Sequence, residues 1–269
     1  MNKETFYLYK NAIQALYPDA WNFSVPKNEG SQNSVVYAIV GDKNMVFKFG
    51  DKKLVQKNEA VSKLYRMRGI PVPQITARCK NGLHFEEYEK IHGISLFEAI
   101  NRGTMSPEQI KQVYRDVIVC FEKMNNVHPT YVNSNLTSAV HEVEKINIAN
   151  VNGKLVGNIF KYLIYLLNIG RDKALYHSGI TPKNIIVDKN GKFSSFIDID
   201  SVNVCSKEYA FQMMATKYQE LGFDISDLIT YYRNTTHDLL QEKSIQRKMN
   251  LLASGKKLLW KMSQKRKTK

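Results

Sequence analysis

The chain has 269 residues, of which 39 are lysine or arginine and 25 are aspartate or glutamate, and 43% of the residues are hydrophobic. This composition excludes a mini-protein and a wholly disordered chain, because it allows a sizeable core in one large domain or two lobes. The formal net charge of +14 favours anionic partners such as nucleotides, phosphorylated sugars, acidic lipid surfaces or nucleic acid, and it disfavours polycationic ligands.

The sequence has no segment typical of membrane insertion or secretion. The longest strongly apolar stretch, residues 162–169 (YLIYLLNI), is much shorter than the roughly 18–20 residues of a transmembrane helix. The amino terminus lacks the continuous apolar region and the cleavage site of a secretory signal. Cys79, Cys120 and Cys205 have no spacing typical of zinc sites or disulfide frameworks, so we interpret them as packing residues. We therefore expect a cytoplasmic protein.

The first 91 residues predict a small sheet with accompanying helices. A helical pattern over residues 4–16 is followed by β-branched and aromatic runs over residues 21–49, which indicate antiparallel hairpins. A second helix is predicted between Gly50 and Gly69. The dipeptide Asn81-Gly82 then separates two further strands, as in a tight hairpin.

The remainder of the chain predicts helices, with one strand pair among them. Ser106 and Pro107 form an N-terminal cap for a helix that continues through Met124. The strand pair covers residues 185–187 and 193–199, joined at Asn190-Gly191. Further helices are predicted over residues 155–167, 207–221, 225–232 and 245–262.

Seven segments follow one another in a characteristic order: EGSQNSVVYAIV, VFKFG, the glutamate in QKNEAVSKLYRMRGIPVPQI, EEYEKIHGISL, NVHP, HSGITPKNIIVD and FIDID. Their order and spacing resemble the aminoglycoside phosphotransferase and choline kinase family, over about residues 29–202. The resemblance implies a two-lobed α+β fold of the protein-kinase type, with ATP held between the lobes. The small β-rich N-terminal lobe would be residues 1–91, and the larger helical C-terminal lobe, with the embedded hairpin, residues 92–269.

A polar loop lies between the first two strand-like runs. It consists of Gly30, Ser31, Gln32, Asn33 and Ser34. The resemblance implies that this loop covers the nucleotide phosphates, where small side chains let backbone N–H groups approach. The residues alone fit an ordinary solvated turn equally well.

Three further positions complete the implied nucleotide site. Lys48 lies in an apolar strand, and the resemblance implies that it contacts the α and β phosphates, with Glu59 on the next helix holding its ammonium in position. Glu87, Tyr88 and Glu89 mark the hinge between the lobes, whose backbone would receive the adenine edge. Individually, Lys48 and Glu59 also fit a surface lysine and an exposed helical glutamate.

The catalytic loop of the family places a histidine, a base aspartate two residues later and an asparagine five residues beyond. This sequence has His177, Gly179 and Asn184, so the spacing is kept and the base is missing. The resemblance implies that Asn184 and Asp198, at the two ends of the hairpin, bind Mg²⁺ through oxygen atoms. Asp200 is then an auxiliary metal ligand or a structural acceptor. We interpret His177 as bracing the loop.

The glycine at residue 179 leaves three interpretations open. A positioned base contributes about 10²–10⁴ in rate. The first interpretation is a divergent phosphotransferase whose base is another residue, water beside Gly179 or the substrate itself, and the second is a catalytically impaired pseudokinase with a regulatory role. A phosphotransferase would use ATP and Mg²⁺ to modify a hydroxyl of a small molecule or glycan, and the net charge favours a neutral or anionic acceptor. The third interpretation is a basic module that contacts membranes or nucleic acid through Lys256–Lys269, although a packed helix with a charged end explains this tail more simply. No RNA-binding signature supports nucleic acid.

Overall fold

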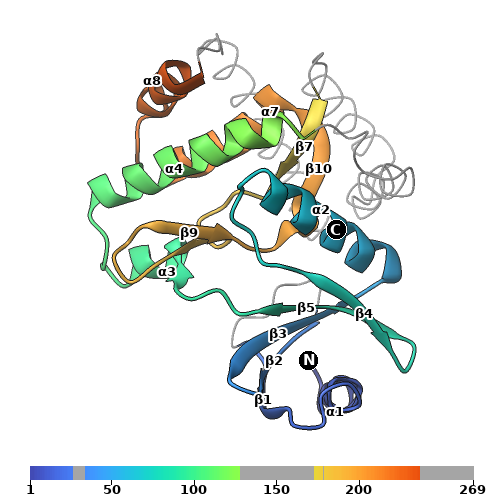
Figure 1. Cartoon of the computed structure of the whole chain (residues 1–269). Coiled ribbons are helices and arrows are strands. Elements are labelled where there is room, and N and C mark those ends of the chain that lie inside the picture. The colour runs from blue at the N-terminus through green and yellow to red at the C-terminus, as the bar shows by residue number, and fades with distance from the viewer. Residues whose placement is uncertain (27–33, 128–172, 178, 237–269) are drawn as a thin grey trace, which may run out of the picture. The chain divides into compact units, whose positions relative to one another are not determined.

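The computed structural model describes residues 1–26, 34–127, 173–177 and 179–236, and Figure 1 shows the chain. The chain divides into two compact units, each made of two separate stretches. The first unit is Met1–Thr104 with Lys183–Asp200, and the second is Met105–Pro182 with Ser201–Lys269.

An antiparallel sheet of five strands forms the centre of the first unit, in the order β1-β2-β3-β5-β4. Gly41, with φ +60°, connects β2 to β3, and Asn81 and Gly82 connect β4 to β5 with φ angles of 53° and 74°. The two consecutive positive φ angles of Asn81 and Gly82 are those of a tight type I′ hairpin turn. The strands are β1 (Trp21–Ser24), β2 (Ser34–Val40), β3 (Lys43–Gly50), β4 (Thr76–Lys80) and β5 (Leu83–Glu89).

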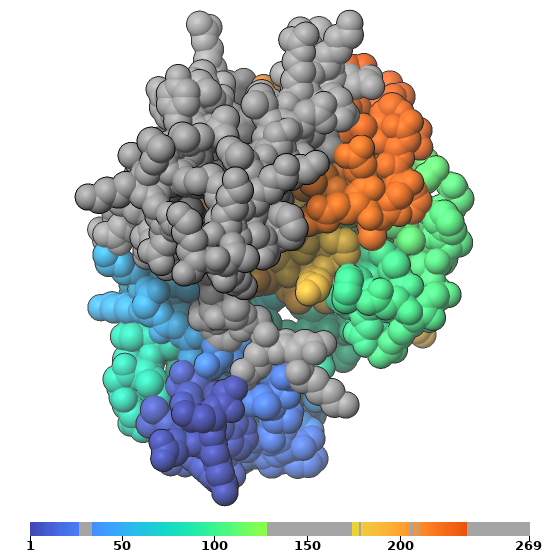
Figure 2. Space-filling model, turned by 180° about the vertical axis from the view of Figure 1, so that it is seen from behind, coloured from blue at the N-terminus to red at the C-terminus, as the bar shows by residue number. Residues whose placement is uncertain are grey.

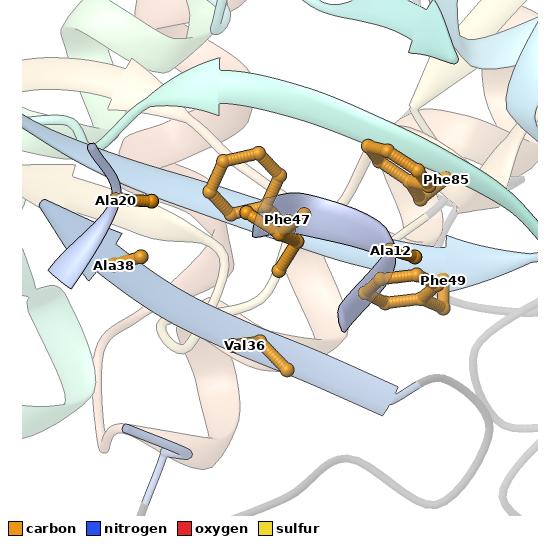
Figure 3. Close-up of a cluster of buried hydrophobic side chains, with 8 residues drawn as sticks. Ala12, Ala20, Val36, Ala38, Phe47, Phe49 and Phe85 are labelled. Atoms are coloured by element: carbon orange, nitrogen blue, oxygen red, sulfur yellow. The ribbon is translucent and has the colours of Figure 1, made fainter. Parts of the chain in front are cut away.

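Helix α1 (Lys3–Gln14) covers one face of this sheet with an aromatic core. Phe47 and Phe85 are fully buried, and Figure 3 shows them beside Ala12 of the helix. Tyr9 stacks on Phe49 with ring centroids 3.8 Å apart. Because burial of a large apolar side chain contributes about 1.5–3 kcal/mol, these rings account for much of the attachment of α1. In Figure 2 the dark-blue N-terminal residues lie against the lighter blue strands.

Helix α2 (Lys52–Met67) covers the opposite face of the sheet (Figure 1). The side chain of Asp51 caps its first turn by accepting a hydrogen bond from the backbone N of Leu54, 2.9 Å away. The buried side of this helix contains Lys57, Asn58 and Ser62 next to its apolar residues. Polar groups in such a position must be hydrogen-bonded, so this face is built for more than packing.

A small second sheet completes the first unit. It joins β6 (Ile94–Ser95), β8 (Ile185–Val187) and β9 (Phe193–Phe196), and α3 (Leu96–Asn101) packs on β8. Gly93, with φ 127°, precedes β6, and a β-carbon there would lie 2.2 Å from the carbonyl oxygen of Val187.

These pairings place residues 92–104 and the hairpin in the same compact unit as the N-terminal sheet. The sequence-based boundary near residue 91 instead assigned both segments to the helical lobe. The reason for the difference is that β6 hydrogen-bonds to β8, a partner that lies about 90 residues farther along the chain.

The second unit is mainly helical in its described part. Helix α4 (Pro107–Asn125) begins with a capping box, in which the side chains of Ser106 and Gln109 each bond the other's backbone. Its Phe121 lies against the rings of Tyr176, Phe211 and Tyr232. The remaining elements are β7 (Lys173–His177), β10 (Val202–Ser206), α7 (Lys207–Glu220) and α8 (Ile225–Thr236).

Strands β7 and β10 form an antiparallel pair that the sequence pattern did not predict, with Val202 opposite His177. The two strands lie about 25 positions apart in the sequence, so no tight hairpin turn between them marks the pair. The helices predicted over residues 155–167 and 245–262, and the basic tail, lie outside the described residues. Among the residues that are described, no helix is both long and apolar enough to cross a membrane.

We predict that Phe47→Ala lowers the free energy of unfolding by about 3–5 kcal/mol, because it removes a fully buried ring from the core under α1. Chemical denaturation monitored by circular dichroism measures the change. Met67→Ala, at a side chain that is 74% exposed, is the control and should change the stability by less than about 0.5 kcal/mol. Equal losses in the two variants would contradict this description of the core.

Candidate nucleotide site

The ammonium group of Lys48 lies between two carboxylates of the first unit. Its Nζ atom is 2.6 Å from Oδ1 of Asp198 and 2.7 Å from Oδ2 of Asp200. Lys48 is 7% exposed, and its neighbours on β3, Phe47 and Phe49, point into the core under α1. Strand alternation therefore directs Lys48 to the opposite face of the sheet.

Burial opposes the charged form of Lys48, but the negative charges of Asp200 and Asp198 outweigh it and raise the pKa of Lys48 above its ordinary value. The lysine is thus a fixed cation at every physiological pH. Asp198 is half-exposed, whereas Asp200 is largely covered. The cation is consequently buried on one side, while one of its carboxylate partners reaches solvent.

Asp198 adopts a backbone conformation that side-chain-bearing residues rarely take. Its φ is 58°, in the left-handed region, and it directly follows the 193–197 part of the hairpin. Aspartate is one of the few residues with a β-carbon that adopt this conformation as single residues. Here it accompanies a carboxylate directed at Lys48.

Asn184 is placed at the same end of the hairpin as Asp198. Ile185 pairs with Phe196, and the backbone N of Ile197 donates a hydrogen bond to the carbonyl oxygen of Asn184 over 2.9 Å. The backbone pairing of β8 and β9 therefore extends to Asn184 and Ile197, which places Asn184 next to the residue before Asp198. An amide and a carboxylate are oxygen donors that suit a hard divalent cation.

Helix α2 contributes two buried polar side chains to this cluster. Lys57 is 1% exposed, and its Nζ donates a hydrogen bond to the carbonyl oxygen of Asp200 over 2.6 Å. The Nδ2 group of Asn58 lies 2.5 Å from Oδ1 of Asp200 and 2.5 Å from Oε1 of Glu86. Helix α2 thus binds both the backbone and the side chain of Asp200.

The cluster contains two ammonium groups and three carboxyl groups, which sets the protonation of its most buried member. Burial raises the pKa of Glu86 to about 7, with Asp200 adding to the effect and Lys48 opposing it. Burial also lowers the pKa of Lys57 to about 8, although Asp200 and Glu86 attract its charge. Protonation of Glu86 removes the excess negative charge.

The predicted pair between Lys48 and Glu59 is not formed in the described part of the chain. The carboxylate of Glu59 accepts a hydrogen bond from the backbone N of Ala77 on β4, 3.0 Å away. Successive helix residues are about 100° apart, so the inward direction belongs to Asn58 and not to Glu59. Lys48 pairs with Asp198 and Asp200 instead.

The three predicted hinge residues have different environments. Glu87 accepts hydrogen bonds from the hydroxyl of Tyr17 and from Arg78, which ties the segment between α1 and β1 to the sheet. All three predicted hinge residues border a cavity of about 440 Å³, which Met45, Thr76, Ile91 and His92 also line. Lys48 and Asp198 are not among its lining residues.

The predicted phosphate loop lies mostly outside the described residues. Gly30, Ser31, Gln32 and Asn33 belong to the residues that the structure leaves undescribed, and Ser34 is the first residue of β2. His177 and Gly179 belong to the second unit. His177 is fully buried, and its Nδ1 atom lies 2.9 Å from Oγ of Ser201.

Comparison with known proteins gives a structural likeness only. No protein-family model and no curated protein sequence matches the chain. Among solved structures, the chain is similar to aminoglycoside phosphotransferase APH(3'')-Id from Streptomyces rimosus, with a TM-score of 0.62 and 12% identity over 93% of this chain and 97% of that one. It is also similar to a type I macrolide 2'-phosphotransferase, with a TM-score of 0.61 and 12% identity over 93% and 87% of the two chains.

A third similar structure is the ternary complex of APH(2")-IIa with streptomycin and ATP, with a TM-score of 0.59 and 13% identity over 98% and 94% of the two chains. The chain has the fold of the aminoglycoside phosphotransferases. It is therefore a two-lobed α+β fold of the protein-kinase type, as the sequence predicted. At identities this low, the likeness carries the fold and not the substrate.

Four residues of the site were not singled out from the sequence. Lys57, Asn58 and Glu86 join the Lys48 cluster, and Ser201 contacts His177. On a helix or strand, polar residues ordinarily indicate a solvated face, so their pattern gave no sign of burial. A signal was present in α2, where Lys57 and Asn58 interrupt the apolar stripe between Val55 and Val61.

The raised pKa of Glu86 predicts a particular dependence of stability on pH. A carboxyl whose pKa is higher in the folded state contributes stability below its unfolded value, near 4.5, that is lost as the pH rises through about 7. We expect Glu86→Gln, which stays neutral, to reduce the fall in melting temperature over this window. Thermal melts of both proteins from pH 4.5 to 8 measure it. Parallel curves for the two proteins would show that Glu86 titrates normally.

Proposed function

We propose that the chain is a divergent phosphotransferase that binds ATP with Mg²⁺ and transfers the γ-phosphate to a hydroxyl of a small molecule or glycan. The observation that carries the proposal is the contact between Lys48 of β3 and Asp198, two residues separated by 150 positions in the sequence. Aminoglycoside phosphotransferases of the same fold have been solved with ATP or with ADP.

The residues present fit a role in phosphate binding. Lys48 supplies a cation that stays charged, and phosphate oxygens would replace one of the carboxylates that it contacts. Because Lys57 and Asn58 hold Asp200 from the helix side, the segment from Asp198 to Asp200 keeps its place when Lys48 changes partner. Positioning of this kind supplies most of the catalysis in phosphoryl transfer.

Asp198 and Asn184 are the residues that would hold Mg²⁺, with Asp200 as an additional carboxylate. Among the described residues, no three His, Cys, Asp or Glu side chains are grouped as a metal site. This donor set suits Mg²⁺, which usually binds one or two protein carboxylates and completes its octahedron with phosphate oxygens and water. When bound, the ion would neutralise charge that develops on the phosphates.

The acceptor is proposed from charge. A chain with a net charge of +14 attracts neutral or anionic hydroxyl compounds more readily than polycations. The cytoplasmic location that the sequence predicts would give access to ATP. Peripheral membrane contact through Lys256–Lys269 remains a proposal about a segment outside the described residues.

A pseudokinase is the second candidate function, and one specific observation favours it. Gly179 occupies the position of the base, and glycine cannot accept a proton. Such a protein would bind nucleotide through Lys48 without turnover and would act as a regulatory protein.

We predict that a saturating excess of MgATP, near 100 times its Kd, raises the melting temperature by roughly 5–10 °C, since ligand binding at this ratio adds about 2.7 kcal/mol. Lys48→Met and Asp198→Asn should each remove most of the shift. The control is Lys63→Met on α2, where the side chain is exposed and its replacement should leave the shift unchanged. No shift in the unmodified chain at any nucleotide concentration would refute the proposed function.

Turnover separates the two candidates. We predict ADP release from MgATP that increases with a neutral sugar or with glucuronate and not with the polycation streptomycin. A coupled spectrophotometric assay measures the rate. Intact MgATP binding without ADP release for any acceptor, water included, would identify a pseudokinase.

A further inference from the structure

The space beside Gly179 is occupied by the side chain of Ser201. A β-carbon built on Gly179 would lie 2.2 Å from Oγ and 3.0 Å from Cβ of Ser201, and 3.3 Å from Cε1 of His177. The backbone of Gly179 is not in the left-handed region, so space and not conformation demands the glycine. A hydroxyl therefore lies where the side chain of the missing aspartate would begin.

Ser201 is held in this place by a second contact. Its Oγ is 2.9 Å from Nδ1 of His177, which is fully buried. Ser201 ends the 3-10 turn Ile199–Ser201 and directly precedes β10, whose first residue, Val202, lies opposite His177 on β7. A serine hydroxyl that is hydrogen-bonded to an imidazole is in the arrangement in which serine exchanges protons most readily.

We propose that Ser201, hydrogen-bonded to His177, accepts the proton of the acceptor hydroxyl in place of the base that is absent at residue 179. This inference rests on the proposed phosphotransferase function, which sets the acceptor near residue 179. The hydroxyl of Ser201 donates to Nδ1 of His177, whose ring proton is then on Nε2.

The proposed step conserves atoms and charge. The acceptor oxygen forms a bond to the γ-phosphorus as the bond from that phosphorus to the β-γ bridging oxygen breaks, and ADP leaves. The acceptor proton passes to Oγ of Ser201, and the serine proton passes to Nδ1 of His177. Because His177 is fully buried, its extra proton afterwards passes from Nδ1 back to Oγ of Ser201 as the serine releases a proton to solvent or to a phosphate oxygen of a product, and both residues are again neutral. No oxidation or reduction takes place.

The geometry also predicts how an aspartate at residue 179 behaves. Gly179→Asp alone must displace Ser201, so it would break the contact with His177 while adding a carboxylate. Gly179→Asp combined with Ser201→Gly has the room that the single variant lacks. An aspartate at residue 179 therefore fits only when residue 201 has no side chain.

The test uses the full chain with MgATP, with water and with the sugar acceptors as probes. Ser201→Ala removes one oxygen atom and should lower kcat by about 10²-fold or more, with little change in the KM for ATP or in the melting shift with MgATP. Ser201→Thr keeps the hydroxyl and should retain much of the rate. The control Thr216→Val, which removes a hydroxyl bonded within α7, should leave kcat unchanged.

A Ser201→Ala variant that folds, binds MgATP and turns over at the original rate would overturn the proposal. So would a Gly179→Asp variant that is faster than the original chain while Ser201 is retained, or an original chain that binds MgATP and releases no ADP. The paired variant Gly179→Asp with Ser201→Gly should recover at least tenfold over Ser201→Ala, and failure to do so would refute this relation between residues 179 and 201. Absence of MgATP binding in the original chain would instead refute the proposed function itself.

Discussion

A buried ammonium shared by two carboxylates is the interaction on which the candidate site depends. Lys48 cannot be removed from water without counter-charges, because a buried unpaired cation is several kcal/mol less stable than a solvated one. Asp198 and Asp200 provide these charges from the segment that follows the hairpin. The same contact therefore fixes the fold of the first unit and brings together the residues that a nucleotide would meet.

The surroundings of this pair explain why α2 has polar residues on its buried side. Three carboxyl groups near one lysine would repel one another, and a second cation, Lys57, reduces that repulsion. Asn58 adds hydrogen bonds to both Asp200 and Glu86. Buried ionic groups contribute little net stability, but they allow few alternative arrangements of the surrounding side chains.

The sequence predicted those features that depend on local chemistry or on spacing. The Asn81-Gly82 turn was predictable because these residues adopt positive φ easily. The proximity of Asn184 and Asp198 was predictable because the two residues flank a short hairpin. The partner of Lys48 could not be predicted in the same way. Which of two adjacent helical residues faces inward depends on the docking angle of α2, and that angle is set by contacts far apart in the sequence.

The neighbour of Gly179 likewise could not be predicted from the sequence. From the sequence, this glycine is simply an absent carboxylate, and nothing marks Ser201 as its neighbour. Only the register of β7 and β10 reveals that one position is small because the other is occupied. The absence of a side chain at residue 179 and the position of the Ser201 hydroxyl are thus one structural feature shared by two residues.

The first unit is built from two separate stretches of the chain, and the ribosome synthesises these stretches at different times. Lys48 leaves the ribosome 150 residues before Asp198, which at about 5–20 residues per second is a delay of roughly 8–30 s. During this interval the first unit lacks β8 and β9 of its small second sheet, and Lys48 lacks the carboxylates of Asp198 and Asp200. The first unit can therefore be completed only after a late segment of about twenty residues, Lys183–Asp200, has been synthesised.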